Sequence, residues 1–350
     1  MYLRYSKKKE KRILWGLAFS AVVLSFVCLF VGSSHMPLSE GIAALLKTSE
    51  DAGNIRIIWN IRIPRVLAAI IAGAGLSVSG LIMQTNLNNI MASPSTLGVS
   101  NAAVFGANLS IIAFAGGFLS TGNNLTNYTL GANPYATSLM AFIFSFISIM
   151  FVLSLCRKQF YTPGVVVLAG IAIGSVWTAG TTLLQFYATD VGLSAAVVWN
   201  FGDLGRASYQ TDLLMFIIVF LCSVFFLLMS WKYNALLSGN AAACTMGVNV
   251  YRLRFVSLLF ASMITAVCVS FLGIIGFVGI ICPHIVKKLI GEDHRYTIPA
   301  SLLSGSILLL LSDTLSRGIG NGSALPVGAI TTMLGAPFFL VIILSGRRFH

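Results

Sequence analysis

The chain has few charged residues for its length of 350. Only 9% of its residues are Asp, Glu, Lys or Arg, whereas soluble proteins carry roughly 25%. Hydrophobic residues make up 57%. So few charges cannot cover a soluble fold with polar groups, which makes soluble enzymes and DNA-binding modules poor interpretations. The composition predicts an integral membrane protein.

Common nucleotide-binding and catalytic motifs are also missing. No G-x-x-x-x-G-K-S/T loop occurs in the sequence, so any ATP must be used by a partner. Neither H-E-x-x-H nor G-x-S-x-G is present. The few charges near apolar segments do not form the series of carboxylates that suits a proton relay, which disfavours an ion-driven carrier without excluding it.

Cysteine pairs are absent too. The six cysteines are scattered singly with no C-x-x-C motif, and the four histidines are dispersed. This pattern indicates neither a disulfide framework nor a zinc site. We predict no catalytic residues, no metal ligands and no cofactor.

Long apolar runs are plentiful. A helix needs about 20 apolar residues to cross a bilayer, and ten such runs can be marked. Their approximate limits are 13–34, 63–84, 95–118, 136–156, 165–188, 211–231, 255–272, 274–290, 298–319 and 325–345. The first follows a basic tail, but its length favours a span over a cleaved signal peptide.

The basic residues predict the orientation, because cytoplasmic segments retain Lys and Arg. With the N-terminus inside, sixteen lie on the cytoplasmic side: Arg4, Lys7, Lys8, Lys9, Lys11, Arg12, Arg157, Lys158, Lys232, Arg252, Arg254, Lys287, Lys288, Arg295, Arg347 and Arg348. Six lie outside: Lys47, Arg56, Arg62, Arg65, Arg206 and Arg317. This distribution supports ten spans with both termini in the cytoplasm, and it explains the net charge of +12 without nucleic acid.

Small residues recur at helical spacing in two spans. Ala69, Gly73 and Ser77 form one row, and Gly170, Gly174, Thr178 and Thr182 form another. Such rows let helix backbones approach closely. Plain helix packing is the favoured interpretation, and a face lining a pore is the alternative.

Two further segments stand out. The run WNIRIPR (59–65) places Arg62 and Arg65 on the outer side, against the usual charge bias. Headgroup anchoring or ion pairing with nearby acids is the alternative to a binding role. On the cytoplasmic side, SGNAAACTMGVNV (238–250) is too polar and short to span. Its Ala-rich start predicts a short helix that Gly247 ends, either as a plain connector or as a docking element.

The last quarter carries the most specific motifs. They are GIIGFVGIICPHIVK (273–287), GEDHR (291–295), DTLSR (313–317), LPVG (325–328) and GAPFF (335–339). Together with RIPR (62–65), ASP (92–94), LGVS (97–100) and MGVNV (246–250), they resemble the FecCD/BtuC-type permease subunits of ABC importers for iron–siderophore complexes, haem and vitamin B12.

This resemblance implies an all-α membrane protein with ten transmembrane helices and the type II ABC importer permease fold. One permease domain would cover 1–350, with a cytoplasmic coupling loop at 232–254. It would be a non-catalytic subunit in a bacterial cytoplasmic membrane. The implied partners are membrane lipid, a second permease (identical or a paralogue), two ATPase subunits, an extracytoplasmic binding protein and a metal-chelate solute.

The resemblance also implies residue roles. Arg62, Arg65 and Arg317 match outer arginines that pair with glutamates of the binding protein. The expected contacts with the ATPase come from Asn240, Ala241, Ala242, Ala243, Met246, Gly247, Val248 and Asn249.

Three positions depart from the family pattern. The sequence has Asn89-Ile90-Met91-Ala92 where Asn-Pro-Leu-Ala is usual, and it lacks acids at Ser238-Gly239-Asn240. It also has Gly202-Asp203 where Gly-Ser is common. None overturns the resemblance.

Two other functions are alternatives to an importer permease. An ion-coupled secondary carrier would show membrane-embedded acids and an inverted repeat, and neither is evident. A membrane-embedded enzyme would need clustered catalytic groups, and Asp313, His284 and Arg317 are not evidently together in the sequence. An iron–siderophore complex is the expected solute, with haem or vitamin B12 as the alternatives.

Overall fold

The computed structural model describes residues 2–32, 36–114, 133–157, 162–319 and 325–345, and the elements in these ranges are helices. They divide into two compact units. The first unit contains Met1–Val78, Asp203–Ser230 and Ile275–His350, and the second contains Ser79–Gly202 and Trp231–Ile274. The expectation of one permease domain over the whole chain stays a prediction.

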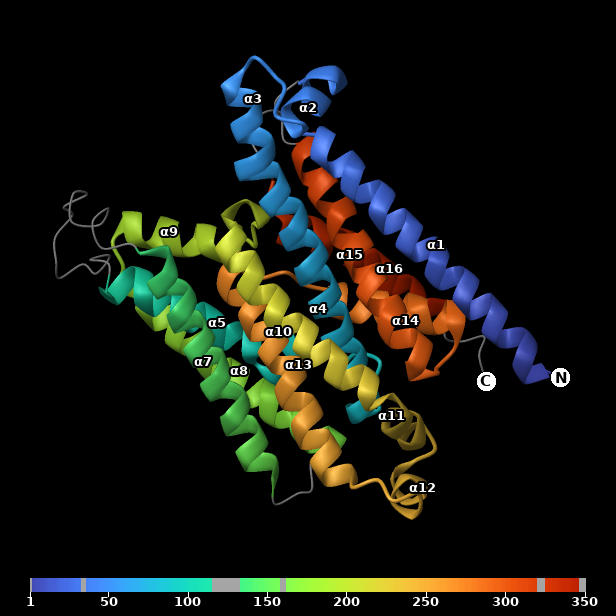
Figure 1. Cartoon of the computed structure of the whole chain (residues 1–350). Helices are drawn as coiled ribbons and strands as arrows, with labels where there is room; N and C mark the ends of the chain where they lie inside the picture. Colours follow the sequence, from blue (N-terminus) through green and yellow to red (C-terminus); the bar gives the residue numbers. More distant parts are fainter. Residues whose placement is uncertain (1, 33–35, 115–132, 158–161, 320–324, 346–350) are drawn as a thin grey trace. The chain divides into compact units, whose positions relative to one another are not determined.

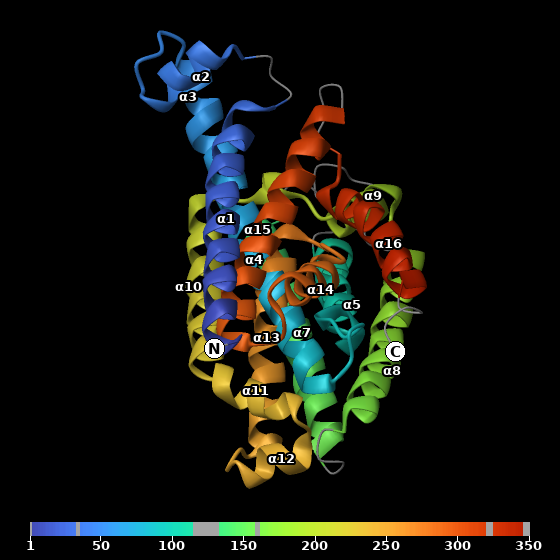
Figure 2. The ribbon, with the colours of Figure 1, turned by 90° about the vertical axis from the view of Figure 1, so that its right-hand side faces the viewer.

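The first unit is built around long helices that pack on α15. Its elements are α1 (Tyr2–Phe30), α2 (Leu38–Leu45), α3 (Ala52–Arg56), the π-helix η1 (Ile57–Arg62), the start of α4 (Ile63–Leu87), η6 (Leu204–Arg206), α10 (Tyr209–Leu228), α14 (Val278–Ile290), α15 (His294–Ile319) and α16 (Val327–Ser345). Helix α1 lies along α15, and α2 and α3 lie beyond the end of α1 that is far from the N-terminus (Figures 1 and 2).

The second unit packs α5 between α7, α8 and α13. It comprises the end of α4, η2 (Pro94–Leu97), α5 (Val99–Asn108), the π-helix η3 (Leu109–Phe114), α7 (Pro134–Cys156), α8 (Pro163–Phe186), α9 (Asp190–Asn200), α11 (Ser230–Leu237), α12 (Asn240–Thr245) and α13 (Val250–Leu272). Helices α11 and α12 lie beside the first turns of α13 (Figure 1).

Each of the ten predicted spans contains a helix. Seven stretches of the described chain are long and apolar enough to cross a membrane: Lys8–Phe30, Ala52–Leu87, Pro134–Cys156, Pro163–Phe186, Tyr209–Leu228, Val250–Leu272 and His294–Ile319. The other three predicted spans hold shorter helices, namely α5 with η3, α14 and α16. The count of ten therefore stays a prediction, and residues 115–118 of the third span, Lys158, Arg347 and Arg348 lie outside the described residues.

Side-chain caps begin several helices. Asn133 accepts from the Tyr135 N–H at the start of α7, and Ser208 and Thr211 form a reciprocal capping box at the start of α10. Such caps satisfy N–H groups that have no partner within the helix, which matters most where little water is present. The caps thus define where these helices begin. Helix α9 and the pair α2 and α3 were not predicted from the sequence.

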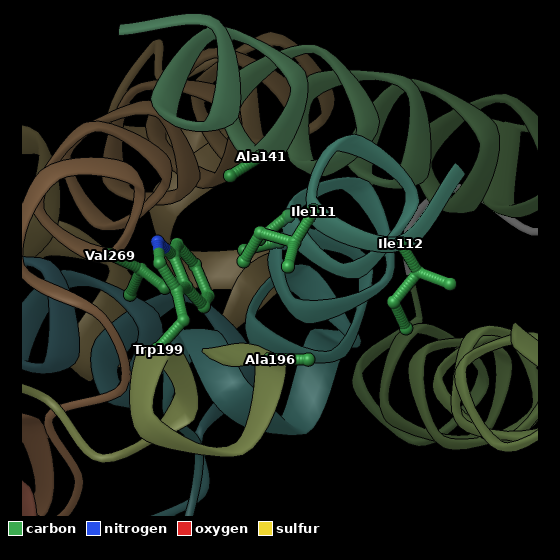
Figure 3. Packing of buried hydrophobic residues seen from close by; sticks show 8 residues of the cluster. Ile111, Ile112, Ala141, Ala196, Trp199 and Val269 are labelled. Atoms are coloured by element: carbon green, nitrogen blue, oxygen red, sulfur yellow. The ribbon is translucent and has the colours of Figure 1, made fainter. Parts of the chain in front are cut away.

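The core of the second unit gathers around Trp199 (Figure 3). Trp199 of α9 and Val269 of α13 lie in one buried cluster with Ala141 of α7 and Ile111 of η3. Helix α9 thereby covers the end of α5 through its apolar face. In the first unit a smaller buried cluster joins α14 and α15, with residues of α1 packed against it.

The row of small residues in α4 is a packing face. A Cβ atom on Gly73 would lie 2.4 Å from the Gly305 carbonyl oxygen of α15, and Ser306 Oγ donates to the Ile70 carbonyl oxygen at 2.8 Å. The backbones of α4 and α15 therefore touch, as small residues allow. This supports the packing interpretation of the row over a pore-lining one.

The row of small residues in α8 is buried at one end and exposed at the other. Gly170 packs on η2, where a Cβ atom would lie 2.5 Å from the Thr96 carbonyl oxygen. Further along the helix, Asn101 of α5 donates to the Gly174 carbonyl oxygen and to Thr178, each at 3.2 Å. Thr182 is exposed. Gly170 and Gly174 are thus packing positions, and the pore interpretation remains open only for the exposed part of the row.

Candidate functional site

The first candidate site is a buried charge cluster around Asp313. Arg65 Nε lies 2.6 Å from Asp313 Oδ1, and Arg317 Nη2 lies 2.8 Å from Asp313 Oδ2. The Asp313 side chain is fully buried, and the two arginine residues are 8% and 7% exposed. One carboxylate therefore holds two guanidinium groups from α4 and α15. Burial makes such contacts stronger than surface ion pairs, at a cost in desolvation.

Two arginines also cap the end of α1. Arg317 donates to the carbonyl oxygens of Val31 at 2.6 Å and Cys28 at 3.0 Å. Arg62 donates to those of Leu29 at 2.8 Å and Phe30 at 3.0 Å. The last carbonyls of a helix have no partner within it and carry partial negative charge. Because the last turn of α1 has no basic residue, η1 and α15 supply the cations that satisfy its carbonyl oxygens.

Asp203 extends the cluster. Its Oδ1 lies 3.6 Å from Arg65 Nη2, and its side chain is 43% exposed. The same oxygen accepts from the Gly205 N–H at 2.8 Å and so begins η6. Asp203 is the departure from the family's Gly-Ser, and the structure explains it as a partner for Arg65. The cluster then holds three arginines and two carboxylates, with one excess positive charge.

The structure thus brings Arg62, Arg65 and Arg317 together around Asp313 and the end of α1, and docking of a binding protein there stays a prediction. The three arginine residues are buried, with exposed fractions between 4% and 8%. Each makes hydrogen bonds or ion pairs with other residues of the chain. This is the internal pairing that the sequence left open as an alternative. The sequence did not place Asp313, His284 and Arg317 together, and the structure joins two of these three, Asp313 and Arg317, in an ion pair. Their spacing of four residues on one helix was the available signal.

The second candidate site is the segment around α12. Ala243 packs inward and is fully buried, and Val248 donates its N–H to the Ala243 carbonyl oxygen at 3.0 Å. Gly247 ends the helix with a φ of +82°. That left-handed conformation strains a residue with a side chain, which is why glycine suits this helix end. The predicted short helix ended by Gly247 is confirmed.

The residues predicted to contact an ATPase play two different parts. Asn240 accepts from Arg254 Nη2 at 2.9 Å, and Asn249 caps α13 by accepting from the Arg252 N–H at 3.0 Å. These two, with Ala243 and Val248, hold the segment in place. The exposed residues of the segment are Asn240, Ala241, Cys244, Thr245, Met246, Gly247 and Asn249, and Ala242 is half-buried. Cys244 and Thr245, which the sequence prediction did not include, are exposed on the same segment.

A turn compensates for another departure from the family. Asn89 Oδ1 accepts from the Met91 N–H at 2.9 Å, and the Asn89 carbonyl oxygen accepts from the Ala92 N–H at 3.1 Å. An Asn side chain that bonds the backbone two residues on makes a turn by itself. The missing proline therefore leaves a turn held by Asn89.

Two of the carboxyl-terminal motifs meet each other. A Cβ atom on Gly335 of α16 would lie 2.5 Å from Cβ of Phe277, which precedes α14 with a φ of +65°. A left-handed conformation is rare for a bulky residue. The GIIGFVG and GAPFF motifs thus have a shared structural basis, because glycine at 335 makes room for Phe277.

Comparison with known proteins agrees with this architecture. A protein from Methanocaldococcus jannaschii described as an ABC transporter permease is 44% identical over 345 residues, covering 98% of this chain and 97% of the relative. The hemin transport system permease protein of Yersinia pestis is 33% identical, covering 96% of this chain and 98% of the relative. The Fe(3+)-citrate import system permease protein of Bacillus subtilis is 32% identical, covering 97% and 98%.

A solved structure supports the same conclusion. It shows an inward-facing conformation of a protein described as an ABC transporter of the metal-chelate type. It matches this chain with a TM-score of 0.81 and 27% sequence identity, and the match covers 96% of this chain and 99% of that chain. The model of the FecCD transport family matches residues 20–345. With helices in all ten predicted spans and a family match over nearly the whole length, the chain is a multi-pass membrane permease that belongs to the FecCD transport family.

Proposed function

We propose that this chain forms the membrane pathway of an ATP-driven importer for an iron–siderophore complex. The observation that carries the proposal is the family match over residues 20–345. The sequence has no phosphate-binding loop, so the energy comes from separate ATPase subunits. Relatives named for hemin and Fe(3+)-citrate transport support a metal chelate as the solute. Haem or vitamin B12 is the alternative solute.

The proposed assembly contains two permeases, two ATPases and an extracytoplasmic binding protein. A single permease would enclose only half of a pathway for a large chelate, so a second copy or a paralogue completes it. The distribution of Lys and Arg supports a cytoplasmic membrane location with both termini inside. In that orientation the α12 segment faces the ATPases and the cluster around Asp313 faces the binding protein.

The α12 segment is proposed to couple ATP hydrolysis to transport. Its outward surface is small and mostly uncharged, with Met246 57% exposed. A methionine side chain is flexible and adapts to an apolar cleft. Its inward side is fixed by the Asn240–Arg254 hydrogen bond and by the buried Ala243. The segment therefore transmits motion through packing, which requires a rigid attachment to α13.

The arginine cluster is proposed to receive the binding protein. Guanidinium groups pair with carboxylates in bidentate fashion, and the cluster carries one excess positive charge. Because Asp313 already occupies Arg65 and Arg317, carboxylates of a partner would compete with it. The docking proposal thus predicts that removing the Asp313 charge strengthens binding.

Uptake by the complete assembly tests the function. The permease, its ATPases and its binding protein are reconstituted in vesicles and offered ferric siderophores, haem or cobalamin, with ATP inside or outside. We expect ATP-dependent uptake of a ferric siderophore, and no uptake with a non-hydrolysable ATP analogue. Exclusive uptake of haem or cobalamin would select the alternative solute. Uptake driven by an ion gradient without ATP would overturn the importer proposal in favour of a secondary carrier.

A further inference from the structure

Two pockets of the first unit meet at Tyr209. One has a volume of about 460 Å³ and is lined by Lys47, Ile55, Arg56, Trp59, Asn60 and Tyr209. The other has a volume of about 530 Å³ and lies between α4, α10 and α15. Its lining is almost entirely apolar and includes Ile71, Phe216 and Phe220. A basic pocket and an apolar groove between membrane-spanning helices therefore lie side by side, with Tyr209 in the wall of both.

Tyr209, which lines both pockets, lies where the hydrocarbon of the membrane meets the headgroup layer. Tyr209 is the first residue of α10, and its hydroxyl donates to the carbonyl oxygen of Trp59, which lies ahead of α4. Trp and Tyr are enriched where hydrocarbon meets the headgroup layer. The basic pocket thus lies at headgroup level, in the leaflet on the side of α2 and α3, and the groove extends into the hydrocarbon.

Several polar groups that line the two pockets lack a hydrogen-bond or ion-pair partner within the described residues. Lys47 Nζ lies 4.5 Å from the ring centroid of Trp59, and within the described residues neither Lys47 nor Arg56 pairs with an acid. The indole Nε1 of Trp59 is buried without a hydrogen-bond partner in the described structure. The same holds for both carboxyl oxygens of Asp212, a residue only 3% exposed that lines the groove.

Unpartnered buried polar groups point to a ligand with polar atoms at this level. Such groups are rare in native structures and call for an explanation. Asp212 lies three residues beyond Tyr209, which is roughly 5 Å deeper at 1.5 Å per residue. This is the depth of the glycerol region of a phospholipid, just beneath its phosphate. A hydrocarbon chain alone would leave Asp212 and Trp59 unsatisfied.

We propose that these pockets bind one phospholipid with an anionic headgroup. Lys47 and Arg56 contact the phosphate, and the Trp59 indole N–H donates to a phosphate or glycerol oxygen. The protonated carboxyl of Asp212 donates to an ester carbonyl oxygen of the glycerol region, and one hydrocarbon chain fills the groove against Phe216 and Phe220. The occupant is a lipid because the groove opens among spanning helices, where a soluble anion has no access.

The test measures lipid bound to the purified permease–ATPase complex by native mass spectrometry. The complex is exchanged into detergent with phosphatidylglycerol or phosphatidylcholine of identical chains. We expect one phosphatidylglycerol per permease, retained about tenfold better than phosphatidylcholine. Inorganic phosphate at the same concentration should not displace it. Equal retention of the two lipids, or displacement by phosphate, would overturn the proposal.

Paired variants locate the site. Lys47→Glu with Arg56→Glu should reduce phosphatidylglycerol retention at least fivefold, whereas Lys8→Glu with Lys9→Glu, an equal charge change on exposed residues of α1, should not. Ala74→Phe narrows the groove and should reduce retention of both lipids, whereas Leu221→Phe, on α10 but outside the groove, should leave it unchanged.

A conservative variant isolates the role of Asp212. Asp212→Asn keeps a hydrogen-bonding group of the same size and should retain most of the lipid, whereas Asp212→Leu should lose several-fold. If the Lys47→Glu/Arg56→Glu variant and the Ala74→Phe variant both retain lipid like the wild type, the pockets are not a lipid site. A cysteine at position 213, which lines the groove, tests the alternative occupant. Efficient cross-linking between two permeases there, with no lipid bound, would show that a second copy of the chain occupies the groove instead of a lipid.

Discussion

Asp313 Oδ1 lies 2.6 Å from Nε of Arg65, a residue 248 positions earlier in the chain. This contact joins α15 to the start of α4, and Arg317 holds the other carboxyl oxygen. Because all three side chains are buried, the small energies of exposed ion pairs do not apply to them. The cluster therefore belongs to the fold of the first unit, whatever else it binds.

Removing the Asp313 carboxylate should destabilise the permease strongly. Asp313→Ala leaves two buried guanidinium groups without their anion, and breaking a buried pair in this way costs about 3–5 kcal/mol. Asp203→Ala is the matched control, because its side chain is 43% exposed and exposed pairs contribute about 0–1 kcal/mol. Chemical unfolding in detergent measures both. Equal, small effects would show that Asp313 is not a stabilising anion.

Loss of either capping arginine should loosen the end of α1. In Arg62→Leu the carbonyl oxygens of Leu29 and Phe30 lose a donor, and buried acceptors left unsatisfied cost about 1–3 kcal/mol. Faster amide hydrogen exchange in the last turns of α1 is the expected result. Arg56→Leu, at an exposed position of α3, should leave exchange there unchanged. Unaltered protection in Arg62→Leu would contradict the capping role.

A side chain at Gly73 should separate α4 from α15. Gly73→Val places Cβ against the Gly305 carbonyl oxygen, at 2.4 Å in the present geometry. Overpacking costs typically about 1–3 kcal/mol, and more where both backbones would have to move. Gly318→Val is the control, because nothing lies within 4 Å of its Cβ position. The yield of folded protein after detergent extraction and its unfolding midpoint should fall only for Gly73→Val.

Gly247→Val should uncouple transport from ATP hydrolysis. At a φ of +82° an L-residue is disfavoured by roughly 1–2 kcal/mol, so the end of α12 should shift. We expect normal membrane insertion with reduced uptake and reduced solute-stimulated ATP hydrolysis. Gly16→Val in α1, where nothing lies within 4 Å of the Cβ position, controls for the added side chain. Unchanged coupling in Gly247→Val would identify the segment as a connector.

Binding-protein affinity tests docking at the cluster separately from stability. If Arg65 and Arg317 receive carboxylates of the partner, Asp313→Asn should lower Kd by freeing them, and Arg65→Gln should raise it. Affinity should also weaken in 1 M salt, where the Debye length is about 3 Å. The Kd values of the variants are compared using preparations that contain the same fraction of folded permease. Unchanged affinity in both would leave the arginines as internal partners only.

The spans were largely predictable, whereas the short elements were not. A run of about 20 apolar residues has one stable solution in a bilayer, a helix with all its backbone hydrogen bonds made internally. Helix α9 escaped prediction because its 11 residues are too few to span and its apolar side is used locally, around Trp199. Length, the strongest signal for a membrane helix, carries no information on such elements.

The sequence by itself determined that the chain crosses a membrane as helices, that its motifs match one permease family, and that Gly247 ends a short helix. Those conclusions rest on local hydrophobicity, composition and backbone preference. Only the tertiary structure decided that Arg65 joins the Asp313–Arg317 pair and that Gly73 meets Gly305. It also placed Asp212 in an apolar groove without a partner. These relationships depend on which faces of distant helices pack together, and no local period in the sequence encodes that choice.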